Sequence, residues 1–341
     1  MARVTIKEIA NATGVHPMTV SRALRNDPKV AAKTLERIRS AARRLGYVPN
    51  AAARAIVTGK FNTVSLVLST CYERSILPFS LQQALINHLH QRSCNLMFTP
   101  LSDEVIATLT PTRFLSEIKC DGILINYNAT IPESLFTLTR RLQLPVIWIN
   151  SKHPSNCIYP DDFKIGQFAT RLLIEHGHRH IVFANHAGES HYSVHDRISG
   201  YRNMMHRHHL SPELITRYDA TPQQLLTFWQ PILRSPQRPT AIFAYTSFEA
   251  WIIYRAATIA GLSIPQDLSL VCVHDAPATH IDIELTTVLL PESAIAQQAV
   301  DDLLTMVETG EKDSPARAIP PEYEPGRTLG PPSTTSIQNI K

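Results

Sequence analysis

The spacing of apolar and polar positions changes character once, after the first sixty residues of the chain. Before that point apolar residues recur every three or four positions, the spacing of amphipathic helices. One helix is predicted to begin after Thr5, which can form a capping box with Glu8, and to end near Gly14. A second helix is predicted to begin at Pro17, and a third to end at Gly46. Helix, short turn and helix in this order predict a helix-turn-helix unit, whose second helix fits the major groove of DNA.

Beyond Thr63, short continuous apolar runs alternate with amphipathic helical stretches. Such runs, bounded by turns and separated by helices, are typical of parallel strands buried on both faces. The fold class predicted for this part is therefore α/β, as two doubly wound lobes with a cleft at the strand ends where a small molecule would lie. The predicted strands are 64–67, 96–98, 122–126, 145–150, 181–185, 240–245 and 268–273, with helices at 80–92, 163–176 and 293–308.

Charge divides the chain at the same place. The 341 residues carry a net charge of +4, but residues 1–60 hold twelve basic and three acidic side chains and so carry +9. The remainder carries −5. This asymmetry indicates a short head that binds a polyanion, joined to a mildly acidic body.

Several classes of protein are disfavoured by what the sequence lacks. Neither phosphate-cradling glycine motif occurs, so no nucleotide cofactor is predicted. No apolar run reaches the length of a signal peptide or membrane span, so we expect a cytoplasmic protein without a membrane partner. The cysteines are odd in number and include no C-x-x-C pair, which favours reduced and mostly buried thiols; they are Cys71, Cys94, Cys120, Cys157 and Cys272.

The motifs of the head carry a resemblance to a known family. The segments T-I-K-E-I-A at 5–10, G-V-x-P-M-T-V-S-R-A-L-R-N at 14–26 and L-G-Y-V-P-N-A-A-A-R-A-I at 45–56 closely resemble the lactose/galactose repressor family of bacterial transcription regulators. The match is nearly without gaps over about sixty residues and looser to the end of the chain. It implies a periplasmic-binding-protein-like core and a homodimer, with a tetramer as the alternative. It also implies a near-palindromic DNA operator and repression controlled by a small sugar or sugar-acid-like effector.

The resemblance also implies which residues contact DNA. The base-reading positions correspond to His16, Pro17, Met18 and Arg22. Arginine can donate two hydrogen bonds to guanine, and methionine offers an apolar contact to a thymine methyl group. The positions that resemble phosphate contacts, which fix register without reading sequence, are Thr5, Thr19, Ser21, Asn26 and Tyr47.

Residues 50–60 are predicted to form a hinge helix of about two turns, too short to be stable alone. Asn50 provides a helix cap, and Gly59 a terminator. The family resemblance implies that this helix pairs with its dimer mate in the minor groove, where Ala53 and Ile56 contact DNA and Ile56 wedges between base pairs. A linker that never becomes ordered is the alternative.

A second group of residues is predicted to bind the effector. By resemblance, the pair Asp161-Asp162, of which Asp161 is predicted to bind the effector, Arg197 in R-x-x-G-Y and Asp275 in V-C-V-H-D occupy family cleft positions. Thr246, Ser247 and His274 replace residues common in relatives and are also predicted to bind it. Arginine opposite carboxylates suits polyhydroxyl or carboxylate ligands. Structural alternatives remain, because Arg197 could cap a helix or bridge the lobes and Asp275 could simply end a strand. A regulator without an effector is also possible.

Two other function classes are suggested by single features of the sequence. His176, His178 and His180 at alternate positions, with His206, His208 and His209 nearby, suggest a metal sensor, although surface histidines are the simpler interpretation and no metal ligand is predicted. A triad of Ser247, His274 and Asp275 is disfavoured because neighbouring strand residues point to opposite faces, so no catalytic residue is predicted. The alternative function is a cytosolic carbohydrate-acting enzyme or metal sensor carrying a helix-turn-helix head.

The predicted domains follow from these assignments. Residues 1–49 form the DNA-binding domain, 50–60 the hinge helix, 61–332 the two-lobed effector-binding and dimerisation domain, and 333–341 a tail. The first lobe is expected to comprise about 61–159 and 289–315, and the second about 160–288 and 316–332.

Overall fold

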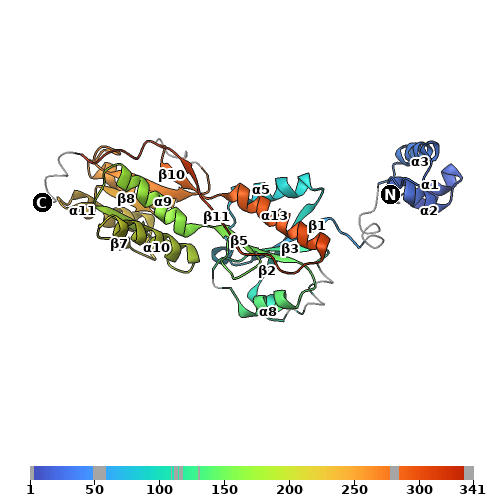
Figure 1. Cartoon of the computed structure of the whole chain (residues 1–341), viewed down its shortest axis with the longest axis horizontal. Coiled ribbons are helices and arrows are strands. Elements are labelled where there is room, and N and C mark those ends of the chain that lie inside the picture. Colours follow the sequence, from blue (N-terminus) through green and yellow to red (C-terminus); the bar gives the residue numbers. More distant parts are fainter. Residues whose placement is uncertain are drawn as a thin grey trace. The chain divides into compact units, whose positions relative to one another are not determined.

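The computed structural model describes residues 4–48, 59–108, 110, 114, 118–129, 131–276 and 284–333 (Figure 1). The chain divides into two compact units, residues 1–61 and 62–341. The hinge-helix residues Asn50, Ala53 and Ile56 lie outside the described residues, as does nearly all of the predicted tail.

The described residues of the first unit form three helices, α1 (Ile6–Thr13), α2 (Pro17–Leu24) and α3 (Ala32–Leu45). The predicted capping box is present, because the Thr5 hydroxyl accepts from the backbone of Glu8 and the Glu8 side chain accepts from the backbone of Thr5. Gly14 and Gly46 end α1 and α3 in the left-handed conformation that glycine adopts without strain. The helices enclose a small core; its buried residues are Ile9, Ala10, Val20, Ala23, Ile38, Ala41 and Ala42.

The second unit contains two six-stranded sheets, one in each lobe. The sheet of the first lobe has the order β11-β5-β4-β3-β1-β2, and all of its paired strands are parallel. Its strands are β1 (Thr63–Ser69), β2 (Asn95–Leu101), β3 (Gly122–Asn126), β4 (Val146–Ile149), β5 (Cys157–Pro160) and β11 (Arg317–Ile319). Its helices are η1 (Tyr72–Arg74), α5 (Phe79–Gln91), α6 (Asp103–Thr108), α8 (Glu133–Arg141) and α13 (Glu292–Thr309).

The sheet of the second lobe has the order β12-β10-β9-β8-β6-β7, in which only β12 pairs antiparallel among the described strands. Its strands are β6 (Ile181–Asn185), β7 (Glu213–Thr216), β8 (Ala241–Ala244), β9 (Ser269–His274), β10 (Thr286–Leu289) and β12 (Glu322–Glu324). Its helices are α9 (Asp162–Glu175), α10 (Tyr192–Arg207), α11 (Pro222–Arg234) and α12 (Ser247–Ile259).

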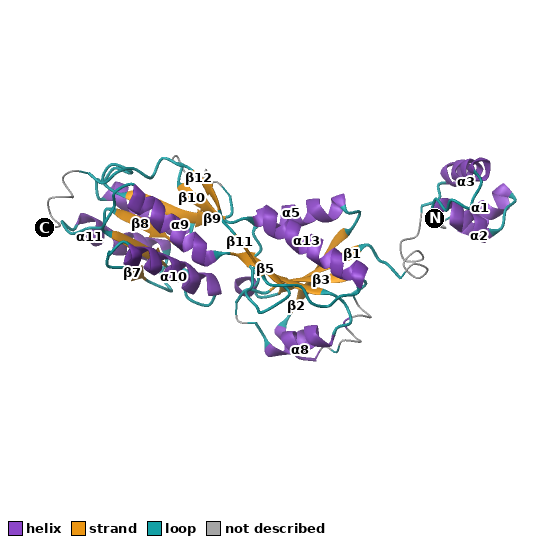
Figure 2. Cartoon of the chain, in the orientation of Figure 1, coloured by secondary structure: helices purple, strands orange, loops and turns teal. Residues whose placement is uncertain are grey.

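Helices cover both faces of each sheet, as Figure 2 shows. In the first lobe, α5 and α13 pack on one face, and α6 and α8 on the other. In the second lobe, α9 and α10 pack opposite α11 and α12. The strands are therefore buried on both sides, which explains their continuous apolar runs and confirms the predicted doubly wound α/β class.

The chain crosses between the lobes three times, from β5 to α9, from β10 to α13 and from β11 to β12. The last crossing differs from the expected boundary. Residues 317–319 were assigned to the second lobe, but they pair with 158–160 and so extend the sheet of the first. A three-residue strand gives too little apolar pattern to show which sheet it joins.

Candidate functional site

Met18 and Arg22 lie on one face of the second helix of the head, because they are four residues apart. Both side chains project into solvent. Met18 is 55% exposed, and the Arg22 side chain is 51% exposed with Asp27 3.9 Å from its Nε. His16 precedes the helix and caps it, because its Nδ1 accepts a hydrogen bond from the backbone of Met18 at 3.2 Å. With Nδ1 accepting, the neutral ring carries its proton on Nε2, which is left as a donor.

The predicted phosphate-contacting residues are partly used inside the head. The Thr5 hydroxyl lies 3.0 Å from Glu8 Oε2 in the capping box, and the Asn26 side chain accepts from Arg39. Tyr47 packs against the core and is half-buried. These contacts fix the positions of the side chains relative to α2.

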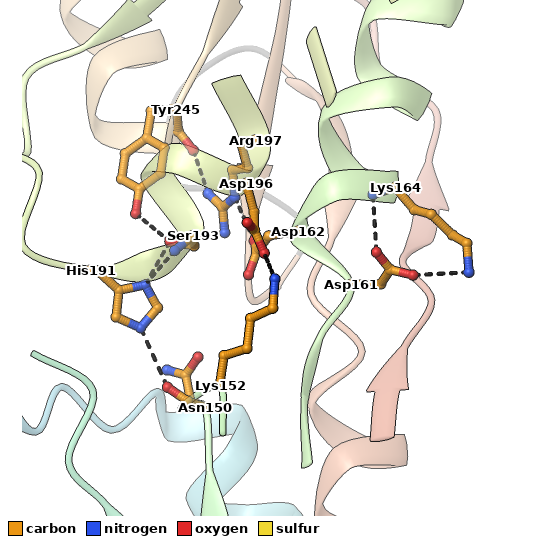
Figure 3. A network of polar contacts seen from close by, with 10 residues as sticks. All are labelled: Asn150, Lys152, Asp161, Asp162, Lys164, His191, Ser193, Asp196, Arg197 and Tyr245. Carbon is orange, nitrogen blue, oxygen red and sulfur yellow. Dashed lines mark hydrogen bonds and ion pairs between the residues drawn. The ribbon is translucent and has the colours of Figure 1, made fainter. Parts of the chain in front are cut away.

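A buried ion pair lies where the second lobe meets the first. Arg197 from α10 donates from Nε to Asp162 Oδ1 at 2.7 Å and from Nη1 to the backbone oxygen of Tyr245 at 2.8 Å (Figure 3). Its guanidinium also lies 4.6 Å from the centre of the Tyr245 ring. Arg197 is 5% exposed and Asp162 1% exposed, so the charge of each is matched by the other within the protein.

Asp161 does not take part in this pair, although it was predicted to bind the effector. Its Oδ1 caps α9 by accepting from the backbone of Lys164 at 3.1 Å, and its Oδ2 lies 2.9 Å from Lys164 Nζ (Figure 3). The carboxylate that reaches Arg197 is that of Asp162, the first residue of α9. Sequence alone did not resolve which of two adjacent aspartates points inward, because that depends on the phase of the helix.

Direct contacts join the two lobes around this pair. Lys152, after β4, lies 2.6 Å from Asp196 of α10, and the His191 ring lies 3.3 Å from the backbone oxygen of Asn150 (Figure 3). Ser80, in the first turn of α5, donates to Asp275 Oδ2 at 3.1 Å. The junction is thus built from polar side chains of both lobes.

The predicted residues Ser247, His274 and Asp275 do meet, but as a hydrogen-bonded chain. His274 Nδ1 lies 3.1 Å from Ser247 Oγ and 3.0 Å from Asp275 Oδ1. The expectation that His274 and Asp275 point apart was wrong, because the chain has left β9 at Asp275. The contacts still differ from a nucleophilic triad, in which serine and carboxylate bind opposite nitrogens of the ring. Hydrogen bonding to His274 holds the pKa of Asp275 below its usual value, although burial opposes this.

The Thr246 hydroxyl takes part in a helix cap. It caps α12 and forms a capping box with Glu249, which is 1% exposed. Burial raises the pKa of Glu249. The predicted ligand-binding role of Thr246 therefore competes with a capping role that the structure shows directly.

Two residues at the junction, Glu292 and Tyr192, were not predicted from the sequence. Glu292, the first residue of α13, is 5% exposed, and its Oε2 has no hydrogen-bond partner among the described residues. The same holds for the hydroxyl oxygen of Tyr192 and for Asp162 Oδ2. Burial, then the charges of Asp275 and Asp162, raise the pKa of Glu292 to about 8. A signal existed in the sequence, since this glutamate stands in the apolar context L-L-P-E-S-A-I-A.

Two cavities of about 500 Å³ each lie elsewhere in the second unit. One is in the first lobe beside the packed rings of Phe136, Trp148 and His153. The other runs along α9 and α10 to Pro320. Neither includes the residues of the junction.

The histidine-rich segments do not assemble a metal centre within the described ranges. No group of three or more metal-ligating side chains was found there. His178, in the turn between α9 and β6, is buried and bonds to Thr240 Oγ1 at 3.0 Å and to the backbone oxygen of Gly330 at 2.9 Å. All five cysteines are free, and three of them are buried. None of the described helices combines the length and apolar character that a membrane span requires.

Comparisons with known proteins agree with this arrangement. A family model described as bacterial regulatory proteins of the lacI family matches residues 5–50, and a periplasmic binding protein-like domain model matches residues 170–329. The chain is 26% identical over 345 residues to the HTH-type transcriptional repressor PurR of Actinobacillus pleuropneumoniae serotype 3 (strain JL03), covering 98% of this chain and 99% of that protein. It is 26% identical over 316 residues to the probable HTH-type transcriptional repressor ExuR of Bacillus subtilis (strain 168), covering 90% and 93%.

Solved structures share the fold. The Lac repressor dimer bound to operator and the anti-inducer ONPF superposes with a TM-score of 0.80 at 21% identity, covering 96% of this chain and all of that one. A complex of the transcriptional regulator CelR with cellobiose superposes with a TM-score of 0.64 at 20% identity, with 96% of this chain covered and 100% of that one.

Proposed function

As a member of the lacI family of bacterial regulatory proteins, this chain is a DNA-binding transcriptional regulator and not an enzyme, and we propose that it represses as a cytoplasmic homodimer on a near-palindromic operator. The observation that carries the proposal is the head itself. A capped three-helix unit of high positive charge presents Met18 and Arg22 on the exposed face of its second helix. The Lac repressor dimer on its operator supports the proposed dimer by analogy of fold.

Within this proposal, His16, Pro17, Met18 and Arg22 read base edges, and Thr5, Thr19, Ser21, Asn26 and Tyr47 contact phosphates. The Nε2–H of His16 and the guanidinium of Arg22 supply donors, and Met18 supplies an apolar surface. The hinge residues Asn50, Ala53 and Ile56 are proposed to enter the minor groove.

The effector is proposed to bind at the junction between the lobes. Arg197, Ser247, His274 and Asp275 lie at or beside this junction. The lobes meet there through the contacts of Asp275 with Ser80, His191 with Asn150 and Asp196 with Lys152. A ligand that contacts both lobes binds more tightly when they are close together, and only such differential binding can couple it to DNA affinity.

The test is genome-wide footprinting of the full chain, followed by affinity measurements on the sites found. Arg22→Ala is expected to weaken the preferred site by about 1–3 kcal/mol and to relax specificity at one base pair of each half-site. Arg37→Ala removes one exposed positive charge from α3 and serves as the matched control. It should weaken all sequences to a similar, smaller extent. Identical footprints for the wild type and Arg22→Ala would overturn the assignment of the reading helix.

A further inference from the structure

The junction between the lobes holds more negative than positive groups. Three carboxylates, those of Asp162, Asp275 and Glu292, lie close enough for the first two to act electrostatically on the third. Among the described residues, the arginine that contacts this group is Arg197, which is bound to Asp162. After this pairing, and with Lys152 bound to Asp196, the carboxyl groups of Asp275 and Glu292 remain without a lysine or arginine partner among the described residues.

Arg197 is poorly placed to capture an anion. Its Nε donates to Asp162 and its Nη1 to the backbone oxygen of Tyr245, and one face of the guanidinium lies against the Tyr245 ring. The bond to Asp162, which is 1% exposed, leaves the remaining N–H groups of the guanidinium as the donors open to a ligand. An anion bound to them would add negative charge beside Asp275 and Asp162, which disfavours a carboxylate ligand.

The atoms that lack partners are mostly acceptors. Asp162 Oδ2 and Glu292 Oε2 are both buried, and neither has a hydrogen-bond donor within the described part of the chain. Burial raises the pKa of the Tyr192 phenol, and the nearby carboxylate of Asp162 adds to this effect. The Tyr192 hydroxyl has no hydrogen-bond partner among the described residues. Asp275 differs, since it already accepts from Ser80 and contacts His274. Buried acceptors without donors are costly, and a ligand carrying donors would relieve that cost.

We propose that the effector is a small cation, with an ammonium group or comparable charged N–H donors that bind between Glu292 and Asp162. Glu292 determines this specificity, because it is 5% exposed, pairs with no cation of the described residues and leaves Oε2 without a hydrogen bond. The inference deepens the proposed function and rests on it. It narrows the sugar or sugar-acid-like ligand implied by family resemblance to one that carries positive charge, such as an amino sugar or another amine.

The charge state of Glu292 gives the proposal a second signature. With a pKa of about 8, raised by burial and by Asp275 and Asp162, the carboxyl group is mostly protonated at neutral pH when no ligand is bound. A bound cation favours the ionised form, so binding must release a proton. Affinity for the cation should therefore rise as the pH increases from 6.5 toward 8. Among the described residues, the other charged or titratable groups near the three carboxylates are Arg197, His191, Tyr192, Tyr245 and His274.

The test measures the thermal stability of the full chain with three sets of probes of similar size. The sets are amino sugars and other small amines, neutral sugars and polyols, and sugar acids. Stabilisation is expected from members of the amine set only. Affinity for the best amine should fall about tenfold or more in Glu292→Gln and stay unchanged in Glu133→Gln, an exposed glutamate of the same lobe.

Calorimetric titration of the best amine in two buffers of different ionisation enthalpy then counts protons. Release of close to one proton in the wild type, and of none in Glu292→Asn or Glu292→Gln, is expected. Circular dichroism shows whether each variant is folded. If either Glu292→Gln or Glu292→Asn does not fold, the other still provides the test.

Stabilisation by sugar acids or neutral sugars alone, by no probe at all, or undiminished amine affinity in a folded Glu292→Gln would each overturn the inference. Operator binding is measured separately on the same samples. Arg22-dependent binding to a specific site, combined with any of these results, would refute the cationic effector and leave the DNA-binding function standing. Absence of any preferred DNA site would refute the proposed function itself.

Discussion

Substitution of Gly200 by alanine tests how the ion pair at the junction is held in place. Gly200 lies within α10, where an added Cβ would stand 2.1 Å from the backbone oxygen of Phe163 in α9, against about 3.4 Å for an ordinary contact. Gly166 makes the reciprocal approach, with an added Cβ 2.2 Å from the backbone oxygen of Arg197. The two helices therefore pack backbone to backbone, and an alanine would push them apart by more than an ångström.

Two effects of opposite sign make the result diagnostic. Replacing glycine by alanine inside a helix normally stabilises it by about 1 kcal/mol. Here overpacking costs about 1–3 kcal/mol, and separation of α9 from α10 stretches the 2.7 Å bond between Arg197 and Asp162, a buried pair whose rupture costs about 3–5 kcal/mol. We expect a net loss of roughly 2–4 kcal/mol in the free energy of unfolding, because the pair is strained and only partly broken.

The assay is urea unfolding of the full chain followed by tryptophan fluorescence. The three tryptophans, Trp148, Trp229 and Trp251, all lie in the second unit, so the signal excludes the head. Ser199→Ala, at the exposed neighbouring position of α10, is the control and should change stability by less than about 0.5 kcal/mol. Unchanged or increased stability in Gly200→Ala would refute the close approach of the two helices.

Three further predictions concern the head, the ion pair and the buried histidines. Thr5→Ala removes the capping box of α1, which costs the helix roughly 1 kcal/mol of stability. Amide hydrogen exchange in residues 6–13 of the full chain should therefore become about fivefold faster, and unchanged exchange would contradict this. Asp162→Asn leaves the buried Arg197 charge unmatched and should lower the urea midpoint by the equivalent of about 3–5 kcal/mol, whereas a loss below about 1 kcal/mol would show that the pair is not desolvated. Burial lowers the pKa of His178 and of His186 from 6.5 to about 4, so the unfolded chain takes up their protons first. The contribution of these two histidines is complete above pH 6.5 and should fall as the pH drops from 6.5 to 5. The raised pKa of Glu292 acts in the opposite direction over this range, so the fall is measured in Glu292→Gln, where a flat urea midpoint would contradict it.

Local signals in the sequence were sufficient for the helices of the head. The Thr5 capping box, Pro17 at the start of α2 and the glycine stops act within a few residues, so each could be read without knowing the rest of the fold. The same holds for β3 and β6, whose apolar runs have the bounds that were predicted. The described strands that the pattern missed are β5, β7, β10, β11 and β12, each only three or four residues long. Of these, β7, β11 and β12 lie at sheet edges.

The residues of the candidate effector site were partly predictable. Arg197, Ser247, His274 and Asp275 were identified by motif, and they do lie at the junction or in the chain of contacts that leads to it. Whether they bind the effector stays a prediction. The motif indicates the pair Asp161-Asp162, but Asp161 was predicted to bind the effector whereas Asp162 points inward, and no motif indicates Glu292.

The sequence by itself determined the class of the protein, its two units and the face of α2 that is exposed, because charge, helix caps and apolar periodicity are properties of neighbouring residues. Only the tertiary structure decided which charges meet. Arg197 and Asp162 are thirty-five residues apart in the sequence, and Glu292 lies at the start of α13 in the other lobe. The balance of positive and negative charge at the junction therefore depends on how α9, α10 and α13 pack. Electrostatic energy follows distance and burial in space, and neither can be read from positions along the chain.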